Sequence, residues 1–152
     1  WDRRLKIEQL DEQLKAVLNR QTIPRFRSGW IKTIRQALGM SARTLGSRIG
    51  VSQSQISKLE NSELDKAITL RSLERVADGL DCELVYFLVP KLESLEMTLV
   101  KRAEQKATDD INRVNTHMAL EGQGLGTVAL QKMIDAEVQS LLYKQPRDFW
   151  GN

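Results

Sequence analysis

The stretch LGSRIGVSQSQISKLEN, residues 45–61, decides the fold of this chain. It divides at Gly50 into two short segments. A glycine commonly ends a helix because it adopts the left-handed backbone conformation without steric cost. Ser52 follows closely, and a serine hydroxyl at such a position accepts a hydrogen bond from a backbone N–H of the helix it precedes. The sequence therefore predicts two short helices, residues 42–49 and 53–61, joined by a tight turn.

Two such helices have the form of a helix-turn-helix, in which the second helix enters the major groove of DNA. Ile56 and Leu59 supply the buried face of that second helix. Its polar side chains then face outwards, where glutamine can bond adenine, serine can donate or accept, and lysine can reach guanine or phosphate. We expect the base-reading residues to be Gln53, Ser54, Ser57 and Lys58. The alternative is that they form the solvated face of an ordinary surface helix.

Helices are also expected on both sides of this motif, which makes the fold class mainly α. Residues 30–38 and 70–80 carry apolar side chains at helical spacing and are bounded by glycine or by a capping hydroxyl. An N-terminal amphipathic helix is predicted for residues 7–18, because apolar residues recur there at intervals of three and four. A basic connector with Arg25 and Arg27 follows it.

A β-strand is predicted for residues 82–89. This segment, CELVYFLV, is rich in β-branched and aromatic residues and is followed by Pro90. A solitary strand has no strand to pair with in its own chain. We therefore expect two copies of the segment to pair in a homodimer.

The C-terminal region is expected to form a helical hairpin. Apolar residues at helical spacing run from Leu92 to Met118, and the glycine-rich segment EGQGLGT, residues 121–127, interrupts them. A second helix follows, capped by Thr127 and ended by Pro146. An antiparallel pair is the simplest arrangement. The expected regions are an N-terminal helix and connector, a DNA-binding domain, and a region for dimerisation or partner binding, which cover residues 1–28, 29–80 and 81–152.

The composition is that of a globular protein, with 41% hydrophobic and 28% charged residues. No apolar run approaches the roughly 20 residues that cross a bilayer, and no cleavable signal segment is recognisable, so we expect a cytoplasmic protein. Cys82 and His117 are the single residues of their kinds, so one chain cannot build a disulfide or a zinc cluster. No nucleophile and base converge. We expect neither a cofactor, nor a metal, nor an enzymatic activity.

The charge is unevenly distributed along the chain. Residues 1–80 hold 15 Lys or Arg against 9 Asp or Glu, a net charge of +6, whereas residues 81–152 hold 8 against 11, a net charge of −3. A basic region can bind a polyanion such as DNA. The first half is therefore the part expected to contact DNA.

Residues 34–80 resemble the lambda-repressor-like DNA-binding domain of phage repressors, Cro and bacterial regulators of the xenobiotic-response-element class. The resemblance implies a structural ion pair between Arg35 and Glu60. It departs from the family at Ser62, where glycine is common after "EN". It places Gln53, Ser54 and Lys58 at base edges. The positions that it implies for phosphate contacts are Ser41, Arg43, Asn61, Lys66 and Thr69.

Over its full length the chain resembles the group called mobile mystery protein A, through the N-terminal helix, the helix-turn-helix, LDCELVYFLVP and MALEGQG. Members are typically encoded beside a Fic-domain protein in mobile elements, which implies an antitoxin-like regulator. Glu121 and Gly122 partly match the inhibitory helix of Fic inhibitors, with His117 where Ser or Thr belongs. The alternative is a helix end with a glycine cap.

The residue patterns and the two resemblances together imply two functions. The first is a dimeric, sequence-specific transcriptional regulator that represses its own toxin–antitoxin-like operon and reads a palindromic operator at the bacterial nucleoid with residues 53–61. The alternative is an antitoxin that neutralises a Fic-domain partner through its C-terminal region.

Overall fold

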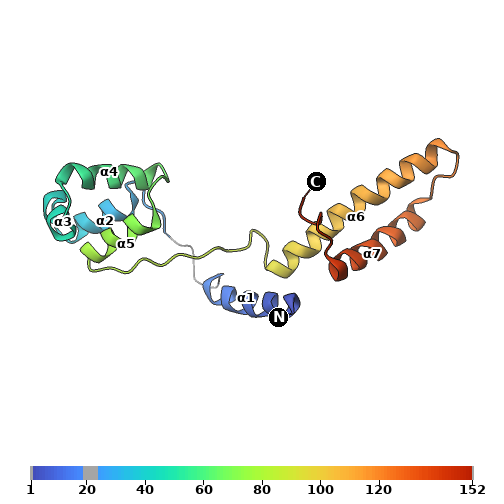
Figure 1. Ribbon diagram of the computed structural model, residues 1–152, viewed down its shortest axis with the longest axis horizontal. Coiled ribbons are helices and arrows are strands. Elements are labelled where there is room, and N and C mark those ends of the chain that lie inside the picture. The colour runs from blue at the N-terminus through green and yellow to red at the C-terminus, as the bar shows by residue number, and fades with distance from the viewer. Residues whose placement is uncertain (1, 19–23, 152) are drawn as a thin grey trace. The chain divides into compact units, whose positions relative to one another are not determined.

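The computed structural model describes residues 2–18 and 24–151 of the chain. Over these residues the structure is entirely helical, with seven α-helices (Figure 1). They are α1 (Arg3–Leu18), α2 (Gly29–Ala37), α3 (Ala42–Ile49), α4 (Gln53–Leu64), α5 (Leu70–Gly79), α6 (Leu95–Leu120) and α7 (Thr127–Lys144). The chain folds as two compact units. The four-helix unit, residues 24–88, holds α2 to α5, and the three-helix unit, residues 2–18 and 89–151, holds α1, α6 and α7.

The predicted dimer-pairing β-strand at residues 82–89 is wrong. The described part of the chain contains no strand, and this segment runs without regular secondary structure from α5 to the three-helix unit. Val85, Tyr86 and Leu88 are all mostly exposed. A strand exists only as part of a hydrogen-bonded ladder, and the described residues of the chain offer this segment no second strand. High β-propensity therefore did not produce a strand here.

The core of the four-helix unit takes side chains from each of its helices. Each of these residues is 3% exposed or less, and fully burying one aliphatic side chain stabilises a fold by about 1.5–3 kcal/mol. The buried set is Ile31 of α2, Leu45 of α3, Ile56 of α4, and Val76 and Leu80 at the end of α5.

The turn between α3 and α4 is built by the residues that predicted it. Gly50 has φ 74°, in the left-handed region, and the Ser52 hydroxyl accepts from the backbone N–H of Gln55 at 3.2 Å. Gln55 returns the contact, since its side-chain oxygen accepts from the backbone N–H of Ser52 at 3.0 Å. A Cβ on Gly46 would lie 2.5 Å from the carbonyl oxygen of Val51, so α3 and the turn meet too closely for any side chain. The predicted bounds of α3 are confirmed.

Helix α4 continues beyond the predicted end at Asn61. Ser62 stands where the resembling family commonly has glycine, and the helix extends to Leu64. The carbonyl of Ser62 then accepts from the backbone N–H groups of Ala67 and Ile68 at 2.8 and 3.1 Å. The chain reverses at Lys66, whose φ is 57°. The segment that leads to α5 therefore starts one helical turn later than predicted.

In the three-helix unit, α6 and α7 form an antiparallel hairpin (Figure 1). The carboxylate of Asp11 in α1 caps α6, accepting from the backbone N–H groups of Leu95 and Glu96 at 2.8 and 3.1 Å. Thr127 does not cap α7 as predicted, because the N-cap position is Gly126. The buried residues of this unit are Ala103, Ala107, Val138, Leu141 and Phe149.

The C-terminal segment closes the core of the three-helix unit. Phe149 is 1% exposed, and its carbonyl oxygen accepts from Nε of Arg102 at 2.7 Å. Lys106 donates to Asp148 at 3.0 Å, and this hydrogen bond lowers the pKa of that carboxyl. The segment after α7 is therefore part of the fold, with Phe149 as its anchor.

Replacing Phe149 by alanine should destabilise the three-helix unit by about 3–5 kcal/mol, because the substitution leaves a cavity in its core. Tyr143 of α7 is 91% exposed, so Tyr143→Ala is the matched control and should cost less than about 0.5 kcal/mol. Urea unfolding followed by circular dichroism measures both variants. Equal losses of stability in the two variants would show that Phe149 does not anchor the unit.

Candidate nucleic-acid interface

The candidate interface is the outward face of α4. Successive residues of a helix are about 100° apart, so Gln53, Ser57, Asn61, Ser54 and Lys58 share an arc of roughly 140°. All five are exposed. The rest of the circumference of α4 is packed into the unit, chiefly through a fully buried isoleucine and a buried glutamate. The structure thus brings the four predicted base-reading residues together on one accessible surface.

These four side chains differ in what they already bind. Neither the Gln53 amide nor the Lys58 ammonium has a hydrogen-bond partner among the residues that the structure describes. The Ser54 hydroxyl lies 3.0 Å from that of Ser52, and the Ser57 hydroxyl donates to the carbonyl oxygen of Gln53 at 3.4 Å. Gln53 and Lys58 are therefore free to bond a ligand without giving up a bond within the protein.

The residues predicted to contact phosphates are also exposed, and two of them cap helices. The Ser41 hydroxyl accepts from the backbone N–H of Thr44 at 3.0 Å at the start of α3. The Thr69 hydroxyl accepts from the backbone N–H of Ser72 at 3.1 Å at the start of α5. A helix N-terminus presents unpaired N–H groups that favour an anion.

The other three predicted phosphate contacts lie on or beside the same helices. Arg43 lies in the first turn of α3, Asn61 on α4, and Lys66 in the turn after α4.

Arg35 and Glu60 form an ion pair between α2 and α4. Nε of Arg35 lies 2.7 Å from Oε1 of Glu60, and the two side chains are only 12% and 10% exposed. Nη1 of Arg35 also donates to the carbonyl oxygen of Met40 at 3.0 Å. The pair therefore joins α4 to α2 and to the chain that leads into α3.

A second carboxylate of α4, Glu63, caps α2. Its Oε1 and Oε2 accept from the backbone N–H groups of Trp30 and Ile31 at 2.6 and 3.0 Å. Gly29 has φ 77°, and a Cβ on it would lie 2.6 Å from Oε2 of Glu63. Glu63 was not predicted, because its partners lie more than 30 positions away and no local pattern marks the contact. Gln55 was also missed, although its spacing from Ser52 is that of a capping box.

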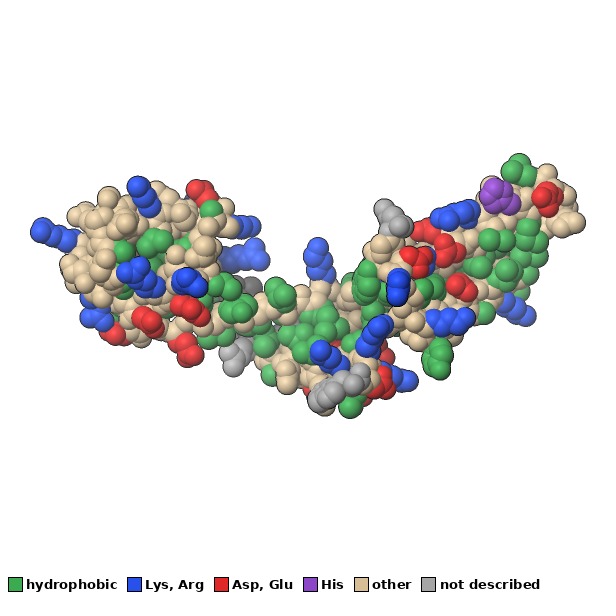
Figure 2. All heavy atoms as spheres, in the orientation of Figure 1, with side chains coloured by type: hydrophobic (Ala, Val, Ile, Leu, Met, Phe, Trp, Pro, Cys, Tyr) green, Lys and Arg blue, Asp and Glu red, His purple; other side chains and the backbone are tan. Residues whose placement is uncertain are grey.

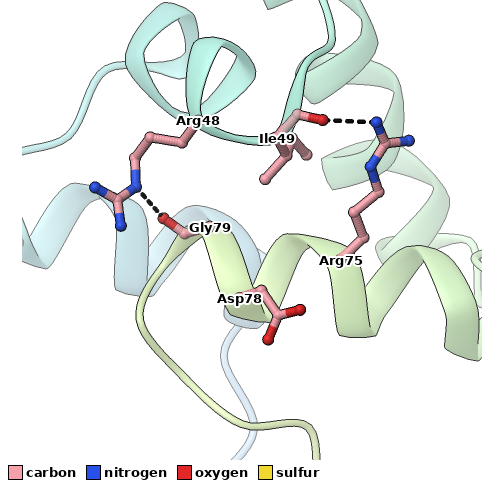
Figure 3. A pocket seen from close by; sticks show the side chains of 5 residues that line it. All are labelled: Arg48, Ile49, Arg75, Asp78 and Gly79. Carbon is pink, nitrogen blue, oxygen red and sulfur yellow. Dashed lines mark hydrogen bonds between the residues drawn. The ribbon is translucent and has the colours of Figure 1, made fainter.

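Two arginines of the same unit serve its fold instead of a ligand (Figure 3). Nε of Arg48 donates to the carbonyl oxygen of Gly79 at 2.7 Å, and Nη2 of Arg75 donates to that of Ile49 at 2.6 Å. Both carbonyls lie at helix C-termini, where cations are stabilising. These arginines line an open hollow of about 400 Å³ together with Asp78. Both guanidinium groups are already hydrogen-bonded to backbone carbonyls. We therefore assign this hollow to the packing of α3 against α5 and not to ligand binding.

Other kinds of site find no support in residues 2–18 and 24–151. No group of three or more His, Cys, Asp or Glu in them could hold a metal ion. None of the helices in this part of the chain combines the length and apolarity that crossing a membrane requires. Glu121 is the C-cap of α6, and Gly122 follows it with φ 75°. This geometry is that of a helix ended by glycine.

Comparison with known families identifies the four-helix unit. Residues 31–87 match the family model described as Helix-turn-helix. The chain therefore contains a lambda-repressor-like helix-turn-helix domain, and such a domain indicates a DNA-binding transcriptional regulator. Searches of curated proteins and of solved structures gave no match. The finer resemblance to mobile mystery protein A finds no support in these comparisons.

Breaking the ion pair of α2 and α4 should destabilise the helix-turn-helix domain. Glu60→Ala leaves the largely buried Arg35 guanidinium without its carboxylate, which costs about 3 kcal/mol or more. The double variant Arg35→Met with Glu60→Leu keeps the volume and removes both charges, so it should cost much less. Urea unfolding of both variants gives the comparison. If the double variant is as unstable as Glu60→Ala, packing and not the buried charge determines the loss.

Proposed function

Because residues 31–87 carry a helix-turn-helix domain, we propose that the protein is a sequence-specific regulator that reads duplex DNA with α4. The observation that carries this proposal is the division of α4 into two sides. Its inward carboxylates are bonded to α2, whereas Gln53 and Lys58 face outwards without partners in the described structure. A glutamine amide can bond an adenine edge, and a lysine can reach guanine acceptors. The hydroxyls of Ser54 and Ser57 already make hydrogen bonds within the protein. They must break these bonds to contact a base, so we expect them to contribute less than Gln53 and Lys58.

Phosphate contacts position α4 in the groove. The start of α3 offers its N-terminal N–H groups and the exposed side chains of Ser41 and Arg43. The end of α4 and the turn after it offer Asn61 and Lys66, and Thr69 begins α5. Contacts of this kind fix orientation and supply affinity without reading sequence. Base reading then comes from α4 alone.

A homodimer on a palindromic operator is the second part of the proposal. One recognition helix buries too little surface for tight specific binding, and two-fold pairing sets two such helices about 34 Å apart. The three-helix unit carries exposed apolar side chains suited to a protein contact, among them Leu120 at 81% and Val128 at 73% exposed. We propose that this unit supplies the dimer contact.

Repression of its own operon, and a Fic-domain partner bound by the C-terminal region, rest on the resemblance to mobile mystery protein A alone. The exposed apolar side chains of the three-helix unit would serve either a second copy or another protein. We favour the second copy, because palindrome reading requires it.

Two alanine substitutions should separate base reading from phosphate binding. Gln53→Ala should relax the preference at one base position, since a good bidentate contact discriminates by about 1–3 kcal/mol. Lys66→Ala should weaken binding to all duplexes alike and lower the salt slope by about 1. Selection from a random duplex pool reports the first effect, and titration of a random 30-base-pair duplex against salt reports the second. An unchanged base preference in Gln53→Ala would remove this residue from the base-reading set.

Sedimentation at micromolar concentration should show a dimer. Leu120→Asp should shift the protein towards monomer, because a charge would then lie in the apolar contact. Leu38 is 55% exposed in the four-helix unit, so Leu38→Asp is the matched control and should remain dimeric. A monomeric wild-type protein at this concentration would contradict the dimer, and a dimeric Leu120→Asp variant would place the contact elsewhere.

A further inference from the structure

A long part of the chain lacks negative charge. No Asp or Glu occurs between Glu12 and Glu60, whereas nine Lys or Arg occur there. Basic side chains project from the surface of the four-helix unit (Figure 2). Two cations of this segment serve the fold, since Arg35 binds Glu60 and Arg48 binds Asp81. Arg43 and Lys58 belong to the interface described above. The connector before α2 holds two more, Arg25 and Arg27.

Both connector arginines are exposed and uncommitted. Neither Arg25 nor Arg27 has a carboxylate partner among the described residues. Phe26, which lies between them, packs edge to face against Trp30 with ring centroids 4.7 Å apart. These rings are themselves 41% and 44% exposed. Because both rings are partly exposed, this pair adds little to the hydrophobic core of the four-helix unit. Its edge-to-face contact instead packs the connector against the start of α2.

The connector is fastened to the C-terminal end of α4. Glu63 binds the backbone N–H of Trp30, immediately after the connector. Glu63 lies ten residues beyond Gln53, which is about 15 Å along a helix. The major groove is about 12 Å wide, so a helix that reads bases near Gln53 has a phosphate backbone near its far end. The connector is therefore attached at the end of α4 that would lie nearest to a flanking backbone.

We propose that residues 24–30 form a second DNA-contacting surface, in which Arg25 and Arg27 bind phosphates beside the groove and the Phe26–Trp30 pair lies against the sugar-phosphate backbone. This inference rests on the proposed function of α4. It extends the footprint of each domain beyond the helix-turn-helix itself. Each cation that neutralises a phosphate releases condensed counterions and steepens the dependence of affinity on salt by about 0.9.

The test uses the full chain and a fluorescent 30-base-pair duplex of random sequence. The variant Arg25→Ala with Arg27→Ala should lower the slope of log affinity against log salt by about 2, and affinity at 0.1 M salt should fall on the order of tens of fold. The control is Lys101→Ala with Lys132→Ala, which makes the same charge change in the three-helix unit and should keep the wild-type slope. Circular dichroism checks folding, and Arg25→Gln with Arg27→Gln replaces the alanine pair if that variant unfolds.

A second readout follows Trp30 directly. In the variant Trp1→Phe with Trp150→Phe, Trp30 is the only tryptophan left. Its quenching by acrylamide should decrease when the random duplex is added at low salt, because the backbone would cover the indole ring. Unchanged quenching at saturating duplex would show that DNA does not reach this surface.

The outcomes separate this inference from the function on which it rests. A wild-type protein that binds no duplex contradicts both. A wild-type protein that binds with a steep salt slope, together with an arginine variant of the same slope, overturns the second surface and leaves α4 as the reader. Equal losses in the arginine and lysine variants also overturn it, since they would reflect net charge and not local contact.

Discussion

The position of α4 depends on two carboxylates that it turns towards α2. Glu60 binds the Arg35 side chain, and Glu63 binds the backbone at the start of α2, so the two helices are joined at two levels. Both bonds lie on the side of α4 that also buries Ile56. Because the helix is held in this way, its rotation is fixed. Gln53 and Lys58 can then face only outwards.

These contacts also neutralise the negative charge of Glu60 and Glu63. A helix that approaches the phosphates of DNA should not present free carboxylates, since like charges repel. The negative charge of Glu60 is balanced by a guanidinium, and that of Glu63 is placed against helix N–H groups, which carry partial positive charge. Both acidic residues that lock the domain are therefore already bonded within it, and residues 13–59, which precede them, carry only positive charge.

Local signals in the sequence predicted local structure well. The bounds of α3 and the start of α4 followed from Gly50 and Ser52, because caps act over one helical turn. The four base-reading candidates shared a face as predicted from helical periodicity, although their contact with DNA stays a prediction. The strand at residues 82–89 was wrong because β-propensity describes what a paired strand favours and cannot supply the partner. Glu63 was missed because nothing near it in sequence marks its contact with α2.

DNA reading by α4 is tested most directly by a chemical-shift titration of the ¹⁵N-labelled protein with a duplex enriched from a random pool. The largest amide shifts should fall on residues 53–58 of α4, with further shifts at the start of α3 and in the turn at Lys66. Shifts confined to the three-helix unit, or to α5 while residues 53–58 stay unmoved, would contradict the claim that α4 reads DNA.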